Sequence, residues 1–381
     1  MDTNTQNLTQ AHRQWASRPA DERFSSLQNM YDFCLKSATN AETENFLLKN
    51  SRVEQEGDND IVVVTPANRR LMFNDWSFRQ FCKRINAPAD YLATLPADMV
   101  VKNVNYGLQN NDDTDTQMYF DKETNVARAI TSQRYGRILN HEVVKAVMDL
   151  PGNWKTPPAR PAFEGQASRI ATEADCMENS LVKPGDVIAD AGLYANDRNM
   201  FAFLIDPEKR IEDGSDGGLS RGFFVRNSEV GDCIWEIVTF LFRTVCGNHI
   251  VWSASDVKSM KIKHLGKAKS RYDTLIASDL KKYAEESAVE DTQWIERARS
   301  LELGKNLEDV QDLIFAKKRF AGKKQVEAAY DLGSKFETVD GNPNTAWGLS
   351  NAFTRLSQLE KNVDERLGMD MVASKILALA K

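Results

Sequence analysis

The sequence lacks the short motifs that mark nucleotide-driven and hydrolytic enzymes. It contains no GxxxxGK[ST] phosphate loop, no GxGxxG after a strand, no HExxH and no GxSxG, so a nucleotide-dependent motor or a dehydrogenase has no support. Only four histidines are present, and general-base or metal chemistry through imidazole therefore has few possible positions. No DxD or DxE stands on an apolar strand, as a two-metal nuclease would need. The sequence favours a protein without catalytic activity and without a cofactor.

Cysteine is scarce as well. The five cysteines are odd in number, widely spaced and free of CxxC pairs, which fits reduced thiols in a cytoplasm better than a disulfide framework. Cys246 and His249, with Cys233 and His264 nearby, supply thiolate and imidazole groups of the kind that bind zinc. Their spacing matches no standard zinc module. We therefore expect Cys246 and Cys233 to be small buried hydrophobic side chains, His249 to be a satisfied polar residue at a strand end, and no metal.

Long apolar runs and a leader sequence are also missing. No run approaches the length of a membrane-spanning helix, and the polar start MDTNTQNLTQ has neither the cationic beginning nor the apolar core of a signal peptide. We expect a cytoplasmic protein that makes no membrane contact. The formal net charge of −6 gives no global reason for nucleic-acid binding, which would have to come from local basic patches.

The length of 381 residues is enough for two or three domains. Strand-like and helical patterns are mixed up to residue 270, and the rest is helical with almost no strand signal. We predict an α+β fold, with a mixed or antiparallel sheet body, flanking helices and a helical C-terminal region. The predicted divisions are 1–150 for an N-terminal α+β part, 151–270 for a β-rich core part and 271–381 for the helical region.

Several elements can be placed from their residue patterns. Asn74 or Asp75 is a suitable N-cap for a helix through Ile85. Residues 187–194 form one strand-like run. Residues 234–245 have the length of a helix, but their β-branched and aromatic content favours a long buried strand.

The proline-rich stretch 151–165 is the best candidate for a linker or a long functional loop. In the C-terminal region, Asp291 and Asn306 are suitable N-caps, and Gly333 is a suitable helix stop. The predicted C-terminal helices cover residues 272–286, 291–303, 307–321, 323–336 and 345–367.

Two segments combine basic and aromatic side chains in a pattern that is typical of nucleic-acid contacts. Residues 128–140 hold three arginines, several hydroxyl groups and one tyrosine around a predicted strand-to-helix junction. Residues 257–272 contain no acidic residue and directly follow the most apolar part of the chain, and a third basic cluster lies at 317–324. A solvated face is the commoner outcome for a basic cluster, and both explanations stay open here. The predicted nucleic-acid contacts are Arg128, Arg134, Tyr135, Arg137, Lys258, Lys261, Lys263, His264, Lys267, Lys269 and Arg271.

Six pieces of the chain carry a family resemblance, and they lie at 15–27, 76–96, 128–144, 221–252, 263–266 and 345–358. Together they resemble the phage- and plasmid-related proteins of the family called domain of unknown function 932. The pieces extend over nearly the whole chain in one order. The resemblance implies a setting in the DNA metabolism of a mobile element, such as recombination, single-strand binding or annealing, or defence against host systems. It transfers no catalytic residue.

Three functions are therefore open. The first is a non-catalytic DNA-binding protein of a mobile element that handles single strands, and symmetric self-assembly would suit strand annealing. The second is a protein–protein interaction module that inhibits or modulates a host defence factor, for which the acidic net charge and the helical C-terminal region would provide the working surface. The third is a metal-dependent nuclease with an unrecognised site.

Overall fold

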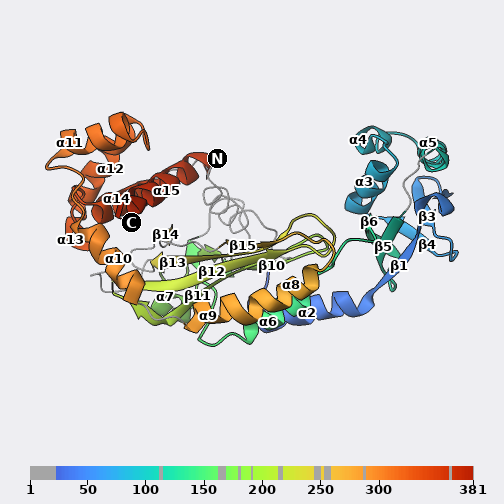
Figure 1. The fold of residues 1–381 in the computed structure, drawn as a ribbon, viewed down its shortest axis with the longest axis horizontal. Helices are drawn as coiled ribbons and strands as arrows, with labels where there is room; N and C mark the ends of the chain where they lie inside the picture. Colours follow the sequence, from blue (N-terminus) through green and yellow to red (C-terminus); the bar gives the residue numbers. More distant parts are fainter. Residues whose placement is uncertain are drawn as a thin grey trace.

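The computed structural model is an elongated α+β molecule (Figure 1). It combines mixed and antiparallel sheets with flanking helices, and its described C-terminal part is helical, which confirms the predicted fold class. Within the described residues, no helix has both the length and the apolar character needed to cross a membrane. The structure describes residues 23–110, 115–161, 169–178, 182–189, 192–212, 218–243, 250–252, 259–285, 289–359 and 363–380.

A six-stranded sheet in the order β1-β5-β6-β4-β3-β2 forms one end of the molecule (Figure 1). Its pairs are antiparallel except for β4 and β6, which run parallel. Helices α3, α4 and α5 pack against it, and Phe81, Val104 and Phe120 are buried between these elements. The elements are β1 (Ala41–Leu47), β2 (Arg52–Glu56), β3 (Asp60–Val64), β4 (Arg70–Phe73), α3 (Asp75–Arg84), α4 (Ala89–Leu92), α5 (Ala97–Gln109), β5 (Asp115–Asp121) and β6 (Val126–Ser132).

Helix α3 starts where the sequence predicts. The Asn74 side chain accepts a hydrogen bond from the Ser77 backbone N–H at 2.8 Å, and the Ser77 hydroxyl oxygen accepts one from the Asn74 N–H at 3.0 Å. This reciprocal arrangement satisfies two N–H groups that a helix start otherwise leaves open. Asn74, rather than Asp75, is therefore the N-cap.

The most apolar part of the chain forms a second, antiparallel sheet in the order β10-β11-β12-β13-β14, with β15 also paired to β13. Residues 235–243 are a strand, as their composition predicts. Ile237 packs into one hydrophobic cluster and Val238 into another, so both faces of β13 are covered and no polar alternation is needed. The strands are β10 (Leu193–Ala195), β11 (Met200–Ile211), β12 (Leu219–Asn227), β13 (Trp235–Arg243), β14 (Ile250–Trp252) and β15 (Ser259–Ile262).

Helices α2, α6, α8 and α9 lie along one face of this central sheet (Figure 1). They bury Met30, Val144, Tyr272 and Leu280 against strand residues such as Trp235. A π-helical turn joins α8 to α9. The segments are α2 (Leu27–Asn40), α6 (Asn140–Met148), α8 (Ala268–Leu275), the π-helical turn (Ile276–Leu280) and α9 (Lys281–Glu285).

The prediction of one strand over residues 187–194 is wrong. Its first half is β9 in a small sheet of order β7-β9-β8, and its end belongs to β10 of the central sheet. Gly192 stands before β10 with a φ of +114°, a backbone conformation that side-chain-bearing residues rarely adopt, and so the chain turns there. The elements around this sheet are β7 (Arg160–Pro161), β8 (Arg169–Ile170), α7 (Glu173–Glu178) and β9 (Val187–Ala189).

The described part of the stretch 151–165 is tied to the central sheet. Lys155 and Ile205 exchange two backbone hydrogen bonds, of 2.9 Å and 2.8 Å. The Trp154 ring contacts the Phe223 ring with centroids 4.8 Å apart. This stretch therefore packs against the central sheet and is not a free linker.

The C-terminal region is a helical assembly around its own hydrophobic cluster. Asn306 caps α11 as predicted, because its side chain accepts from the Asp309 N–H at 3.1 Å. The predicted single helix over 345–367 is wrong, since α14 and α15 are separate helices that pack together through residues such as Phe353 and Ile376. The elements are α10 (Val289–Ser300), α11 (Leu307–Gln311), a π-helical turn (Asp312–Lys317), α12 (Lys323–Lys335), α13 (Glu337–Asp340), α14 (Ala346–Leu359), α15 (Val363–Leu377) and a final 3-10 turn (Ala378–Ala380).

Two further C-terminal predictions are wrong for packing reasons. Gly333 does not stop a helix but lies inside α12, where a Cβ atom would come within 2.8 Å of the Ala352 Cβ. Asp291 does not cap a helix but lies within α10, and its carboxylate forms an ion pair of 2.7 Å with Arg221 of β12. Both residues serve contacts between elements that are distant in sequence.

Candidate nucleic-acid interface

The two basic segments singled out in the sequence meet in the structure. Tyr135 and Leu265 form an antiparallel bridge. On either side of it, the Gly136 N–H donates to the His264 carbonyl at 3.1 Å, and the Gly266 N–H donates to the Arg134 carbonyl at 2.9 Å. We call residues 134–137 together with 263–271 the basic junction.

The close approach at the basic junction depends on glycine. A Cβ atom on Gly136 would lie 2.8 Å from the Gly266 carbonyl oxygen and 3.0 Å from the Ala268 Cβ. Gly266 itself has a φ of +55°, in the left-handed region that glycine enters without steric cost. The segments can approach this closely because Gly136 carries no side chain, and the backbone conformation at Gly266 suits a glycine.

Two rings of the basic junction stack on each other. The Tyr135 and His264 rings are 5.2 Å apart at 21°, and the Tyr135 hydroxyl donates to the Ser228 carbonyl at 2.8 Å. Burial lowers the pKa of the His264 imidazole to about 4, so the ring is neutral at neutral pH. Its Nδ1 atom lies 3.2 Å from the Gly136 carbonyl oxygen, and because that oxygen only accepts, Nδ1 carries the hydrogen. The two rings thus form a neutral, packed part of the basic junction.

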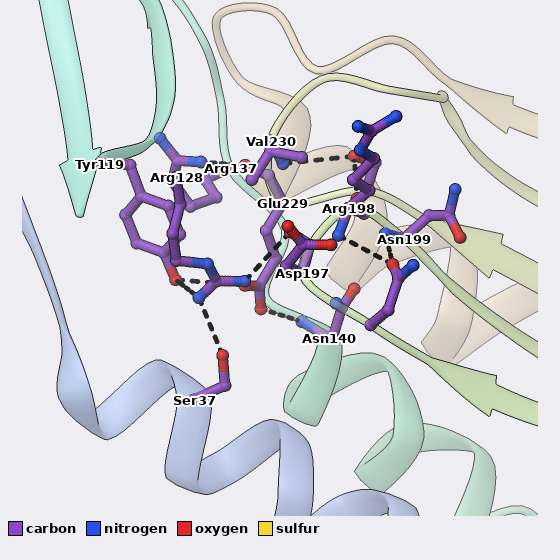
Figure 2. A network of polar contacts seen from close by, with 12 residues as sticks. Ser37, Tyr119, Arg128, Arg137, Asn140, Asp197, Arg198, Asn199, Glu229 and Val230 are labelled. Atoms are coloured by element: carbon purple, nitrogen blue, oxygen red, sulfur yellow. Dashed lines mark hydrogen bonds and ion pairs between the residues drawn. The ribbon is translucent and has the colours of Figure 1, made fainter. Parts of the chain in front are cut away.

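Next to the basic junction, the carboxylate of Glu229 is the centre of a buried polar network (Figure 2). Glu229 is only 1% exposed. Its carboxylate accepts from the Tyr119 hydroxyl at 3.1 Å, from the Arg128 guanidinium at 3.3 Å and from the Asn140 backbone N–H at 2.7 Å. The donors come from β5, β6 and the first residue of α6. We call this network the Glu229 hub.

The Glu229 hub also supplies a helix cap. Helix α6 has Leu139 at its N-cap position, and that side chain makes no capping hydrogen bond. The Glu229 carboxylate takes over the role by accepting from the Asn140 N–H, where a negative charge is favourable at the positive end of a helix. A buried carboxylate is thus stabilised by a cation and a helix N-terminus together.

Arg137 belongs to the Glu229 hub, although it is also part of a basic segment. Its guanidinium donates to the Glu229 carbonyl oxygen and, at 2.9 Å, to the Gln117 side chain. The same guanidinium lies 3.9 Å from the centre of the Tyr119 ring, a cation–π contact. Arg128 likewise has internal partners, among them the Ser37 hydroxyl at 2.8 Å.

Helix α3 is bound to the loop that carries Glu229. The Val230 carbonyl accepts from the Trp76 indole N–H at 3.0 Å and from the Gln80 amide at 2.7 Å. The Gln80 side-chain oxygen in turn accepts from the Ile130 backbone N–H at 2.8 Å. The N-terminal sheet is therefore joined to the central sheet at the loop that follows β12.

Two predicted lysines form ion pairs within the protein. Lys261 lies 2.9 Å from the Glu236 carboxylate, and Lys269 lies 3.0 Å from Glu142 and 2.9 Å from Asp273. Lys269 therefore has two carboxylates that offset its charge, whereas Lys261 shares Glu236 with Arg226, which lies 2.6 Å from the same carboxylate.

Four other predicted residues remain exposed on the basic junction, and within the described part of the chain none of them forms an ion pair. Arg271 donates to the Leu265 carbonyl at 3.1 Å, a contact that leaves its charge uncompensated. The structure thus divides the predicted contacts into buried groups, ion-paired groups and an exposed cationic set. The exposed set is Arg134, Lys263, Lys267 and Arg271.

Some sequence predictions concern residues outside the described ranges, namely Lys258, Cys246 and His249. Among the described residues, no group of three or more histidine, cysteine or acidic side chains is placed to hold a metal ion. The thiol of Cys34 is buried near the Glu229 hub, and burial together with the charge of Glu229 raises its pKa to about 12. Cys34 is therefore a protonated packing group at neutral pH.

Sequence reasoning missed the central residue of the network. Glu229 stands in the short polar run Asn227–Ser228–Glu229, between the apolar strands β12 and β13. A carboxylate in the most apolar part of the chain needs a partner if it is buried, and that rule could have drawn attention to it. Its partners could not be named, because they come from three distant elements.

Comparison with known proteins gives one match. A family model described as "Domain of unknown function (DUF932)" matches residues 173–366. This range begins in α7 and ends in α15, and it contains Glu229 and the 263–271 side of the basic junction. No curated protein and no solved structure matches the chain.

Proposed function

The chain belongs to the DUF932 family, and from this starting point we propose that it is a non-catalytic DNA-binding protein that holds single strands at the basic junction. The setting that we propose is the DNA metabolism of a phage or plasmid, as the family resemblance implies. The observation that carries the proposal is the pairing of residues 134–137 with residues 263–266, because it brings exposed cations from two distant segments onto one surface.

The physical argument rests on counterion release. A nucleic-acid backbone carries condensed cations, and lysine or arginine contacts to phosphates set those cations free. In a chain with a net charge of −6, such binding must be local. The four exposed cations of the basic junction supply local positive charge. The buried Arg128 and the half-buried Arg137 join the two sheets next to it.

A direct test is the salt dependence of binding to a labelled single-stranded oligonucleotide, measured by fluorescence anisotropy. The wild-type chain should bind at low salt and lose affinity steeply as salt rises. The triple variant R134Q/K263Q/K267Q should bind much more weakly, and its log–log salt slope should be less steep by about 2, since each phosphate contact on a single strand contributes about 0.7.

The chain offers a matched control. The triple variant K318Q/K323Q/K324Q removes the same formal charge from exposed residues of the third basic cluster. Its affinity and salt slope should stay close to those of the wild-type chain. Equal losses in both triple variants would mean that only net charge matters and that the basic junction is not the site.

Absence of wild-type binding at low salt to single-stranded and double-stranded DNA would overturn the proposal. In that case, a host protein retained on the immobilised chain after nuclease treatment would favour the protein-interaction alternative. Cleavage of the oligonucleotide that a chelator abolishes would instead favour the nuclease alternative.

A further inference from the structure

One apolar side chain stands at the tip of the basic junction. Leu265 is 53% exposed, although His264 on one side of it and Ala268 just beyond are buried. Lys263 and Lys267 lie two positions before and two positions after it in the chain. Leu265 therefore presents hydrocarbon to the solvent between two cations.

Hydrogen bonds fix the backbone at Leu265 and at the next residue. The Leu265 N–H donates to the Lys263 carbonyl at 2.7 Å, and the Leu265 carbonyl accepts from the Arg271 guanidinium at 3.1 Å. The next residue is tied to Arg134 by the 2.9 Å hydrogen bond from the Gly266 N–H. The exposed side chain of Leu265 therefore stands on a fixed backbone. Binding a partner would cost little conformational entropy, because the backbone is already ordered.

Isolated exposed hydrophobic residues are common and need no explanation by themselves. Leu265 differs from them in its surroundings. The same contacts that fix its backbone involve Arg134 and Arg271, which are two of the four exposed cations. An anionic polymer held by these cations would bring its non-phosphate groups onto this leucine.

We propose that Leu265 is a wedge that enters between two neighbouring bases of a bound single strand. The inference rests on the proposed DNA-binding function and names the part of the strand that this site recognises. Apolar side chains separate stacked bases in other nucleic-acid complexes, and the base faces offer the flat apolar surface that an aliphatic side chain prefers. The cations then hold the flanking phosphates, and the neutral ring of the neighbouring His264 is fixed by its stacking on Tyr135.

The experiment uses an oligonucleotide with 2-aminopurine inside a run of adenines, because this base fluoresces more strongly when its neighbours no longer stack on it. Binding of the wild-type full-length chain should raise the fluorescence. The variant L265A should still bind, with an affinity lower by about 5-fold, the lower end of what one lost base contact costs, but without the rise in fluorescence. Variant L359A truncates a leucine that is 69% exposed at the end of α14, and it should behave like the wild-type chain.

The outcomes separate the wedge from the binding function. If L265A binds as tightly as the wild-type chain and raises the fluorescence equally, the wedge is overturned while the proposed function stands. If the wild-type chain binds no DNA, the function falls and the wedge falls with it. Binding to vesicles of anionic phospholipid that L265A abolishes, with no DNA binding, would assign the cations and the leucine to a lipid surface and overturn both.

Discussion

Arg137 and Arg134 lie three positions apart on the same segment and have opposite surroundings. Arg137 donates to the Glu229 carbonyl and to Gln117, and its guanidinium packs over the Tyr119 ring. Arg134 is exposed, and its backbone carbonyl accepts from the Gly266 N–H; among the described residues its guanidinium forms no ion pair. One arginine holds two sheets together, and the other is available to a partner.

The same contrast applies to the whole of the two regions. In the Glu229 hub, cations and a carboxylate are buried together and satisfy one another. In the basic junction, by contrast, four cations are exposed. The two segments that carry them are held together by backbone hydrogen bonds and by the stacked neutral rings of Tyr135 and His264. A cluster of basic residues in a sequence can therefore contain both structural cations and cations that are free to contact a partner. Burial decides which of the two roles each residue has.

The largest effect should come from breaking the Glu229 hub. E229A leaves the Arg128 guanidinium buried without its carboxylate, and removal of one partner of a buried ion pair costs about 3–5 kcal/mol. Urea denaturation of the variant measures the loss. The double variant R128M/E229L should lose clearly less than E229A, because it leaves no buried charge unpaired. A loss of similar size in both would mean that packing, and not charge, holds this region.

The second effect concerns His264, the buried histidine of the basic junction. Burial lowers its pKa in the folded chain to about 4, whereas an unfolded histidine titrates near 6.5. Between these values the unfolded state binds more protons, so stability is lost as pH falls from about 6.5 to 4, by about 3 kcal/mol at most. Variant H264F keeps a stacked ring and should flatten this part of the pH dependence. Identical profiles for both proteins would contradict the prediction.

The third effect should come from G136A. The added methyl group would lie 2.8 Å from the Gly266 carbonyl oxygen, and overpacking of this kind costs about 1–3 kcal/mol. The variant should also lose DNA affinity, because the segment of Arg134 moves away from the segment of Lys263. Gly368 of α15 has open space at its Cβ position, so G368A should leave the free energy of unfolding and the DNA affinity unchanged or slightly improved.

The smallest effect on stability should come from R134Q. Substitution of an exposed residue usually changes the free energy of unfolding by no more than about 0.5 kcal/mol, and Arg134 is exposed. Its effect should be on binding, where the salt slope becomes less steep by about 0.7. If R134Q lowered the melting temperature as much as G136A does, Arg134 would have a structural role like that of the residues of the Glu229 hub. The proposed difference between the two regions would then be wrong.

Local patterns in the sequence were sufficient for several elements. The side chain of Asn74 caps α3, and the β-branched content of residues 235–243 gave β13 correctly. The break between β9 and β10 was missed because it depends on the positive φ of Gly192. The residue pattern on both sides of this glycine is typical of one continuous strand. The divisions at residues 150 and 270 stay a prediction.

The candidate site was found only in part, for a physical reason. The two basic segments could be recognised by their composition, and they do meet. Composition could not show that Arg128 is buried against Glu229 or that Lys261 is paired with Glu236, since those partners come from other strands. Leu265 was unremarkable in the sequence because exposure is a property of the folded chain.

The contact between Gly136 and His264 joins residues 128 positions apart, and this separation has a consequence for the order of events during synthesis. Arg134 leaves the ribosome early, but the residues that face it follow only after β10 to β15 have been made. Closing so long a loop is entropically costly until the intervening strands have folded, so the junction forms late. A growing chain therefore passes through a long stage in which it has the arginines but not the assembled surface on which the proposed nucleic-acid binding depends.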